Sequence, residues 1–330
     1  MWGVPAGHGH VRCRPFGACH PHPRRVRIRS TLAVLCVGGP LLLGAQAPRD
    51  SAVTGLRAPH ARFEILPSGQ LFPSLIASLQ EPQLRNSLIG ASSERDLNTL
   101  LGVTEQGASI SLWRLNGQRR GDGVELSIQG SAAAQFDLAS ARWTLLNADY
   151  TFSYPVTVRR GPVAARLRYV HVSSHLGDRY LLQRPDARRF GGAGYRRESV
   201  ELLVARTFGD SSRSVVAYTG GAHAFAVTPK DMKRGTVRGG LDASHRFHEF
   251  GATARASWVG GAEVSLAEDR RWNAGVSARL GYEIGRSSGE WPGGRRYRML
   301  LEYYDGPATY GHFSRVDRLR SVGIGCYVIP

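Results

Sequence analysis

The stretch Val163-Ala164-Ala165-Arg166-Leu167-Arg168-Tyr169-Val170 decides the expected fold. In an extended strand, one face carries Val163, Ala165, Leu167 and Tyr169, and the other carries Ala164, Arg166 and Arg168. The same alternation recurs in residues 237–246, 276–284 and 297–303. Repeated two-residue periodicity predicts β-strands that each have one apolar and one polar face.

Two architectures produce this pattern, a water-soluble β-sandwich with its apolar face inward and a transmembrane β-barrel. The barrel is favoured because the runs are about 10 residues long, as a tilted crossing requires, and because Arg and Glu recur on the polar face, as in a polar lumen. Aromatic residues near the strand ends fit interface girdles: Trp113, Trp143, Tyr150, Tyr169, Trp258, Trp272, Tyr297, Tyr303 and Tyr304. We predict an all-β, transmembrane antiparallel β-barrel of about 10–12 strands.

Eleven runs are candidate strands, which conflicts with the even number usual in bacterial single-chain barrels. They are 106–115, 123–137, 144–158, 163–173, 196–208, 213–225, 235–246, 250–260, 272–285, 295–304 and 319–329. Pro155 inside the third run is unfavourable, because proline cannot donate to the ladder. The short connections near 159–162, 209–212 and 247–249 are expected in the periplasm and the longer loop 174–195 at the cell surface. This orientation disagrees by one strand with a count from a periplasmic N-terminus.

Three parts of the chain are expected. Residues 1–47 resemble a signal peptide or extended leader, with the basic run Arg24-Arg25-Val26-Arg27-Ile28-Arg29, a short apolar stretch, and Ala45-Gln46-Ala47 as a cleavage site. Residues 48–105 are a non-barrel extension: a plug, a periplasmic strap or a partly disordered arm. Residues 106–330 are an outer-membrane β-barrel, so the expected location is the bacterial outer membrane.

Composition narrows the function classes. The formal net charge is +17, but the arginines are spread through the alternating runs and form no single patch, which argues against nucleic-acid binding. After leader cleavage only Cys326 remains, so the fold depends on no internal disulfide. The mature sequence contains no metal-ligand spacing and no nucleotide motif, and the cofactor is left unknown. Membrane lipid, lipopolysaccharide and the outer-membrane insertion machinery are the expected partners.

The segment His171-Val172-Ser173-Ser174-His175-Leu176-Gly177-Asp178 carries the candidate chemistry. Continued alternation puts His171 and Ser173 on the lipid face, where a polar pair is costly unless it functions or meets headgroups. An imidazole beside a hydroxyl can act as general base for a serine nucleophile, with a carboxylate orienting the ring. The candidate carboxylates are Asp178, which we take first, Asp186 and Glu198. The alternative is that these polar residues contact headgroups and cap a loop.

The segment also resembles the signature H-x-S-S-H-L-G-D of a bacterial family, domain of unknown function 1207. Ser174, His175 and Gly177 are its further motif residues. Matching pieces are Phe63 to Pro73, Glu81-Pro82, Gln135-Phe136-Asp137, Asn147-Ala148-Asp149-Tyr150, Tyr304-Asp305-Gly306 and Tyr310-Gly311-His312-Phe313. The resemblance implies an exported envelope protein and supplies no activity.

A weaker similarity is to outer-membrane phospholipase A and lipid A deacylase, barrels with an outward-facing His-x-Ser pair on a strand. It implies a lipid acyl hydrolase of the outer leaflet in which Ser173 attacks and His171 takes the proton. The other hypothesis is a non-enzymatic barrel, either a narrow pore or a structural envelope protein. In a pore, lumen-facing arginines would favour anions: Arg166, Arg168, Arg238, Arg246, Arg255 and Arg279.

Overall fold

The computed structural model of the chain describes residues 62–93, 99–183, 194–250, 254–286, 296–309, 311–313 and 318–329. The chain divides into two units, Met1–Leu56 and Arg57–Pro330, and every described residue belongs to the second unit. The leader predicted for residues 1–47 and the candidate Asp186 lie outside the described residues.

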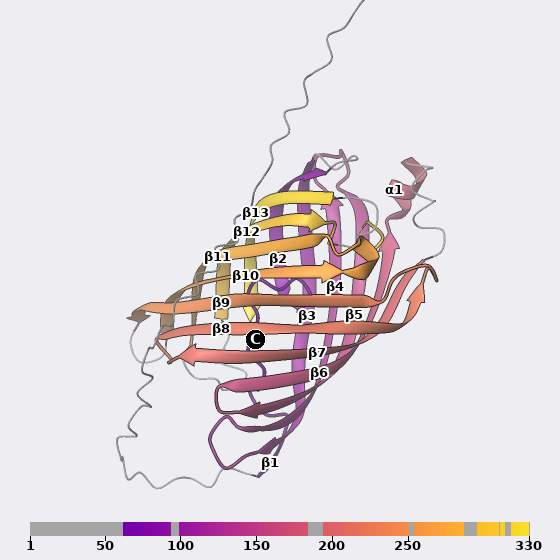
Figure 1. The fold of residues 1–330 in the computed structure, drawn as a ribbon. Coiled ribbons are helices and arrows are strands. Elements are labelled where there is room, and N and C mark those ends of the chain that lie inside the picture. The colour runs from indigo at the N-terminus through magenta and orange to yellow at the C-terminus, as the bar shows by residue number, and fades with distance from the viewer. Residues whose placement is uncertain are drawn as a thin grey trace, which may run out of the picture. The chain divides into compact units, whose positions relative to one another are not determined.

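Antiparallel strands dominate the described chain (Figure 1). They are β1 (Phe63–Ile65), β2 (Leu84–Ser93), β3 (Thr99–Asn116), β4 (Gly123–Asp137), β5 (Thr144–Arg160), β6 (Val163–Leu176), β7 (Tyr195–Gly209), β8 (Arg213–Thr228), β9 (Gly235–Phe250), β10 (Ala254–Ala267), β11 (Ala274–Arg286), β12 (Arg296–Pro307) and β13 (Arg318–Ile329). Two short helices, α1 (Asp178–Gln183) and η2 (Glu268–Arg270), lie in connections. No helix among the described residues is long and apolar enough to cross a membrane.

The sheet closes on itself. The sheet has thirteen strands. The short strand β1 pairs with β3 at residues 113–115, beyond the part of β3 that pairs with β2, so twelve strands form the wall. Each wall strand pairs with its neighbour in sequence, and β13 pairs with β2. The prediction of an all-β antiparallel barrel of about 10–12 strands is therefore confirmed, with the even strand number that closure of hairpins produces.

The predicted strand list missed β2, so the start of the barrel at residue 106 is wrong. Residues 84–93 form a wall strand, and β3 begins at Thr99 rather than at 106. The alternation failed in β2 because the lumen is apolar where this strand ends: Ile89 and Ala91 point inward and are buried. With a mixed outer face and a partly apolar inner face, β2 has no clear two-residue signal.

With β2 added, the strand count from a periplasmic N-terminus no longer disagrees with the orientation expected from the loop lengths. The barrel end that holds the start of β2 and the end of β13 is called the near end, and the opposite end, which carries α1, the far end. The short connections 161–162 and 210–212 lie at the near end, and the connection 177–194 lies at the far end. A count from the near end now agrees with the assignment from loop lengths.

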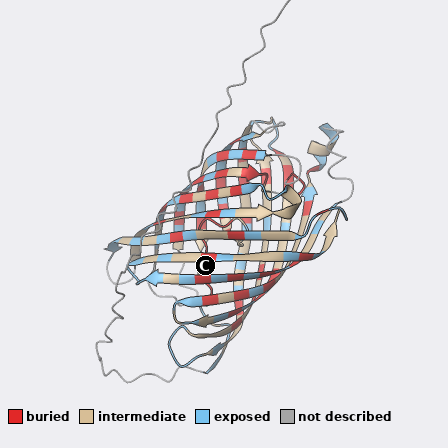
Figure 2. Ribbon diagram, in the orientation of Figure 1, coloured by how far each residue is buried: buried red, intermediate tan, exposed pale blue. Residues whose placement is uncertain are grey.

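The two faces of the wall are the reverse of those in a soluble sheet. Leu280 and Leu301 point outward and are 58% and 62% exposed, whereas the neighbouring Arg279 is 4% and Glu302 is 9% exposed inside. Figure 2 shows this alternation of buried and exposed residues along successive strands. A β-sandwich would bury the apolar face instead. One predicted girdle residue is wrong: Tyr304 points into the lumen, where its hydroxyl donates to the carbonyl of Pro307.

Pro155 lies inside β5 without breaking the strand. The ladder between β4 and β5 skips the position of Pro155: Leu126 pairs with Val156, and the next pair is Gln129 with Ser153. The register is the same on both sides of this gap. A local gap is the expected effect of a residue without an N–H group.

Residues 66–83, a part of the predicted extension 48–105, run inside the barrel as a plug. Phe72 and Leu75 are buried against side chains of β6, β7 and β8. Ile76 packs in a second cluster with Val259, Leu300 and Tyr327. Because the plug contacts strands around the wall, it fills the middle of the lumen. The segment 66–83 is called the plug below.

Candidate functional site

His171 and Ser173 lie on the outer face of β6. The inward residues of this strand, including Arg166, Arg168 and Ser174, are buried, and the intervening Leu167 is 51% exposed. The alternation continues without a bulge in the pairing with β5 and β7. The polar pair therefore shares a face with the apolar outer belt, as the sequence pattern predicted.

Glu198 on β7 is the carboxylate that orients His171. The two residues are direct cross-strand partners, and His171 Nδ1 lies 2.8 Å from Glu198 Oε1. The hydroxyl of Tyr169 donates to the other oxygen of the same carboxylate. The imidazole is thus held through Nδ1 and its Nε2 is left for a second partner.

Ser173 sits between an aromatic ring and a cation. Its cross-strand partners are Tyr150 on β5 and Arg196 on β7. Arg196 Nε lies 3.9 Å from Glu198 Oε1, and its side chain is 55% exposed. Among the described contacts no hydrogen bond joins Ser173 to His171. The two residues are two positions apart on one face, about 7 Å along the strand, which is within reach of both side chains.

Asp178, which the sequence analysis took first as the third catalytic residue, does not lie beside His171. It is exposed in the first turn of α1, beyond the end of β6, and no contact among the described residues joins it to His171. Directly after the strand, Gly177 passes so close to β5 that a Cβ atom on it would lie 1.9 Å from the carbonyl oxygen of Leu145. The structure brings Glu198 to the histidine in its place.

Ser174 belongs to a different cluster on the inner side of the strand. Its hydroxyl donates to Asn147 Oδ1 at 3.0 Å, and Asn147 Nδ2 donates to Asp149 at 2.7 Å. The backbone N–H of Gly311 donates to Asp149 at 3.0 Å. His312 Nε2 lies 2.8 Å from the backbone oxygen of Ser174 and not against its hydroxyl. This cluster, called the far-end latch, fastens the loop after β12 to β5 and β6.

Three sequence pieces that carried the family resemblance meet in the far-end latch. They are the segments around Asn147 and Asp149, around Ser174, and around Gly311 and His312. The sequence model of the family described as "Protein of unknown function (DUF1207)" matches residues 43–328. The chain belongs to this family.

Two solved structures similar to this DUF1207 chain are autotransporter domains. The beta domain of the Bordetella autotransporter BrkA is 11% identical, with 74% of this chain and 97% of that chain covered and a TM-score of 0.38. The translocator domain of NalP from Neisseria meningitidis is 12% identical, with 75% and 89% covered and a TM-score of 0.33. Both scores are too low to support an argument about function. No curated protein matches significantly, so the similarity to phospholipase A and lipid A deacylase rests on the His-x-Ser spacing.

The far-end latch lies over an apolar cluster that closes this end of the lumen. Leu101, Leu146 and Phe313 are buried in the cluster, and Tyr180 of α1 packs edge-to-face on Phe313 with ring centroids 5.5 Å apart. Leu79 of the plug packs against the same cluster. Apolar side chains therefore fill the part of the far half that lies against β2, β3, β5, β12 and β13.

Replacing Asn147 by alanine tests the far-end latch. Asn147 is fully buried, and the substitution removes the hydrogen-bond partners of Ser174 and Asp149. Leaving buried polar groups unpaired costs about 1–3 kcal/mol, so we expect the free energy of unfolding to fall by about that amount. Denaturant unfolding of the refolded protein measures it. A change within 0.5 kcal/mol, the usual range of surface substitutions, would show that the latch contributes no stability.

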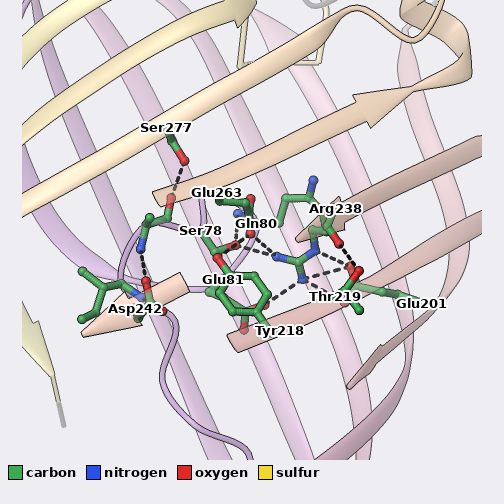
Figure 3. A network of polar contacts seen from close by, with 12 residues as sticks. Ser78, Gln80, Glu81, Glu201, Tyr218, Thr219, Arg238, Asp242, Glu263 and Ser277 are labelled. Carbon is green, nitrogen blue, oxygen red and sulfur yellow. Dashed lines mark hydrogen bonds and ion pairs between the residues drawn. The ribbon is translucent and has the colours of Figure 1, made fainter. Parts of the chain in front are cut away.

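Charged side chains on the inner face of the wall contact the plug (Figure 3). Glu81 lies 2.6 Å from Arg166, 3.0 Å from Arg238 and 3.4 Å from Arg168. Two further wall carboxylates complete the network: Glu201 lies 2.7 Å from Arg168, and Glu263 lies 3.1 Å from Arg238. The plug carboxylate thus neutralises part of a buried arginine cluster.

Hydrogen bonds from the wall also hold the plug backbone. Asp242 accepts from the N–H of Ile76 at 2.8 Å and of Ala77 at 3.3 Å. On the other side, Arg279 donates to the carbonyl of Ile76 and Ser277 to that of Ala77, each at 2.7 Å. The backbone of Ile76 and Ala77 is therefore hydrogen-bonded on both edges, as buried backbone must be.

The loop after β8 is fixed beside the outer site. Glu268 accepts from the backbone N–H groups of Gly235 at 3.0 Å and Arg234 at 3.2 Å, and these bonds hold the pKa of Glu268 below its ordinary value. The carbonyls of Lys233 and Arg234 accept in turn from Arg197. This chain of contacts positions the start of β7, next to Arg196, which is the cross-strand partner of Ser173. Among the described residues, no group of three or more His, Cys, Asp or Glu side chains is placed to hold a metal ion.

Proposed function

We propose that this protein is an integral β-barrel of the bacterial outer membrane. The support is the closed wall, with its apolar side chains outside and its charged side chains within. In hydrocarbon every backbone group needs an internal partner, and closure of the sheet supplies one along the whole wall. The leader predicted for residues 1–47 provides the export that this location requires.

We further propose that the barrel hydrolyses acyl esters of lipids in the outer leaflet. The observation that carries this proposal is the contact of 2.8 Å between His171 and Glu198 on the outer face, with Ser173 two residues further along the strand. Polar and ionisable residues on a lipid-facing surface are costly and are retained mainly for function. The far-end position of the site corresponds to the outer leaflet under the loop-length orientation.

The residues can be assigned to the steps of ester hydrolysis. Ser173 Oγ attacks the ester carbonyl while His171 Nε2 takes the hydroxyl proton, and Glu198 stabilises the resulting imidazolium through Nδ1. The guanidinium of Arg196, cross-strand from Ser173, offers positive charge for the developing oxyanion. His171 then protonates the leaving alkoxide. Water, activated by the same histidine, hydrolyses the acyl-serine and releases the fatty acid.

Substitution of Ser173 by alanine tests the proposal. Wild-type protein reconstituted in vesicles should release fatty acid from an acyl-ester lipid, and Ser173→Ala should release none above background, because the nucleophile is gone. Ser92→Ala is the matched control, since Ser92 is an exposed serine near the far end of β2. Equal release by wild type and Ser173→Ala would remove Ser173 from the mechanism. Absence of release from wild type would leave a closed, non-enzymatic envelope barrel.

The occupied lumen argues against the narrow-pore hypothesis. Four of the predicted lumen arginines, Arg166, Arg168, Arg238 and Arg279, are buried, and each contacts the plug. The apolar cluster at the far end adds a second closure. Of the six, Arg246 and Arg255 line open space without a described contact to the plug, and Arg166 borders the same space while it is paired with Glu81. An anion path through this arrangement would require displacement of both closures.

A further inference from the structure

A cavity of about 1320 Å³ occupies the near-end part of the lumen. Its walls are the inner faces of β8 to β13, part of β3, and the plug, which forms its floor. Small-molecule sites in proteins are concave and usually of about 300–1,000 Å³, so a ligand of that size fits with room for water. This space is called the near-end cavity.

One wall of the near-end cavity carries more positive than negative charge. Its arginines are Arg246, Arg255, Arg296 and Arg298. Glu283 is shared by Arg298 at 2.6 Å and Arg296 at 3.5 Å, and Glu249 is shared by Arg246 at 2.8 Å and Arg255 at 4.0 Å. Asp242 on β9 also lines this wall, so four guanidinium groups face three carboxylates. This excess favours an anion at the near-end rim, where Arg255 and Arg296 remain partly exposed.

The deeper wall is apolar. It is lined by Phe72, Leu75, Ile76, Val259 and Leu300. Phe72 and Leu75 belong to one hydrophobic cluster of the plug and wall, and Ile76 belongs to another. An occupant with a hydrocarbon part would replace water against these side chains, which is favourable in proportion to the apolar area covered.

Two buried polar atoms beside the cavity have no hydrogen-bond partner within the described part of the chain. They are Arg166 Nε and Ser109 Oγ, and both residues line the cavity. Arg166 is 3% exposed and its guanidinium lies over the ring of Phe72, 4.3 Å from the centroid. An unpaired buried donor is unusual in proteins, and a polar ligand atom or a water carried with it would satisfy it.

We propose that the near-end cavity binds an amphipathic anion, a medium-length acyl chain with one acidic head group. The head group binds among the rim arginines, and the chain extends along the apolar wall toward the plug. This placement follows from the charge at the rim and the apolar side chains behind it. The site is inside the barrel and its ligand binding does not depend on hydrolysis at Ser173.

Titration calorimetry with the full chain, kept soluble in an amphipathic polymer, tests this site. The probes are octanoate and 1-octanol, which share the chain and differ in the acid. We expect octanoate to bind at one site and octanol to bind about ten-fold more weakly or worse, since octanol cannot form the charge-assisted contact with the rim arginines. Equal binding of the two probes, or binding of neither, would overturn the proposal.

Substitutions in and outside the near-end cavity test where octanoate binds. The double substitution Arg255→Gln with Arg296→Gln is expected to weaken octanoate binding about ten-fold or more, whereas Arg213→Gln, an exposed near-end arginine outside the cavity, leaves it unchanged. Ser244→Trp fills the cavity from β9 without removing charge and is expected to abolish binding. Octanoate binding that survives Ser244→Trp would place the ligand on the outer surface instead.

Discussion

Replacing Glu81 by alanine is expected to lower the free energy of unfolding by about 3–5 kcal/mol. The Glu81 carboxylate lies within 2.6–3.4 Å of Arg166, Arg168 and Arg238, and these three side chains are at most 3% exposed. Removing one partner of a buried ion pair leaves uncompensated charge, which costs more than the pair itself contributes. The plug would also lose its strongest attachment to β6 and β9.

Equilibrium unfolding of the refolded barrel in denaturant measures this effect. The matched control is Glu249→Ala, which also removes a carboxylate from two arginines but at a position that is 56% exposed. Exposed pairs contribute about 0.2–1 kcal/mol, so the control should stay close to wild type. Similar losses in both variants would mean that the network around Glu81 is as well hydrated as the protein surface, and the plug would then be only loosely held.

The barrel wall could be predicted because membrane strands carry their signal locally. In the strands from β4 to β13 the outward side chains are mainly apolar and the charged ones lie mainly inward, so the face of a residue follows from its neighbours two positions away. Some inward positions, such as Leu203 and Leu300, are apolar as well. Strand β2 broke this rule because Ile89 and Ala91 face the apolar far-end cluster rather than a polar lumen. Which side chains face a residue across the lumen depends on residues far away in the sequence, so no local pattern predicts them.

The plug shows the same limit. The poor alternation of residues 48–105 predicted an extension outside the wall, but it left a plug, a strap and an arm open. What decides among them is the match between Glu81 and Arg166, 85 residues apart in sequence, and between Asp242 and the backbone of Ile76, 166 apart. Such partners are set by the closure of the barrel and cannot be read from spacing.

For the outer site, the alternation on β6 correctly predicted that His171 and Ser173 share the outer face. The third residue needed the register between β6 and β7, which pairs His171 with Glu198. The connection between these strands, 177–194, is long, so its length could not fix that register from sequence. Asp178 was the nearest acid in sequence, but the chain leaves the strand at Gly177 before reaching it.

Replacing His171 by alanine is expected to reduce acyl release by about 10²–10⁴-fold, the usual contribution of a general base. His175 is the matched control, because it lies the same two residues from Ser173 on the same face of β6 and is exposed. The difference between the two is their partners. His171 contacts the Glu198 carboxylate, whereas His175 packs edge-to-face against Tyr150, with ring centroids 5.9 Å apart.

The measurement is the initial rate of fatty-acid release from mixed micelles by equal amounts of folded protein. Only a histidine with a carboxylate behind it is stabilised as the imidazolium that forms when serine attacks, so His175→Ala should keep most of the activity. The rate of fatty-acid release by Glu198→Gln should fall as that of His171→Ala does, because the amide removes the negative charge while preserving the size of the side chain. If His175→Ala proves the more damaging of the two histidine variants, the base faces Tyr150, and Glu198 serves only to hold Tyr169 and His171 on the surface of the barrel.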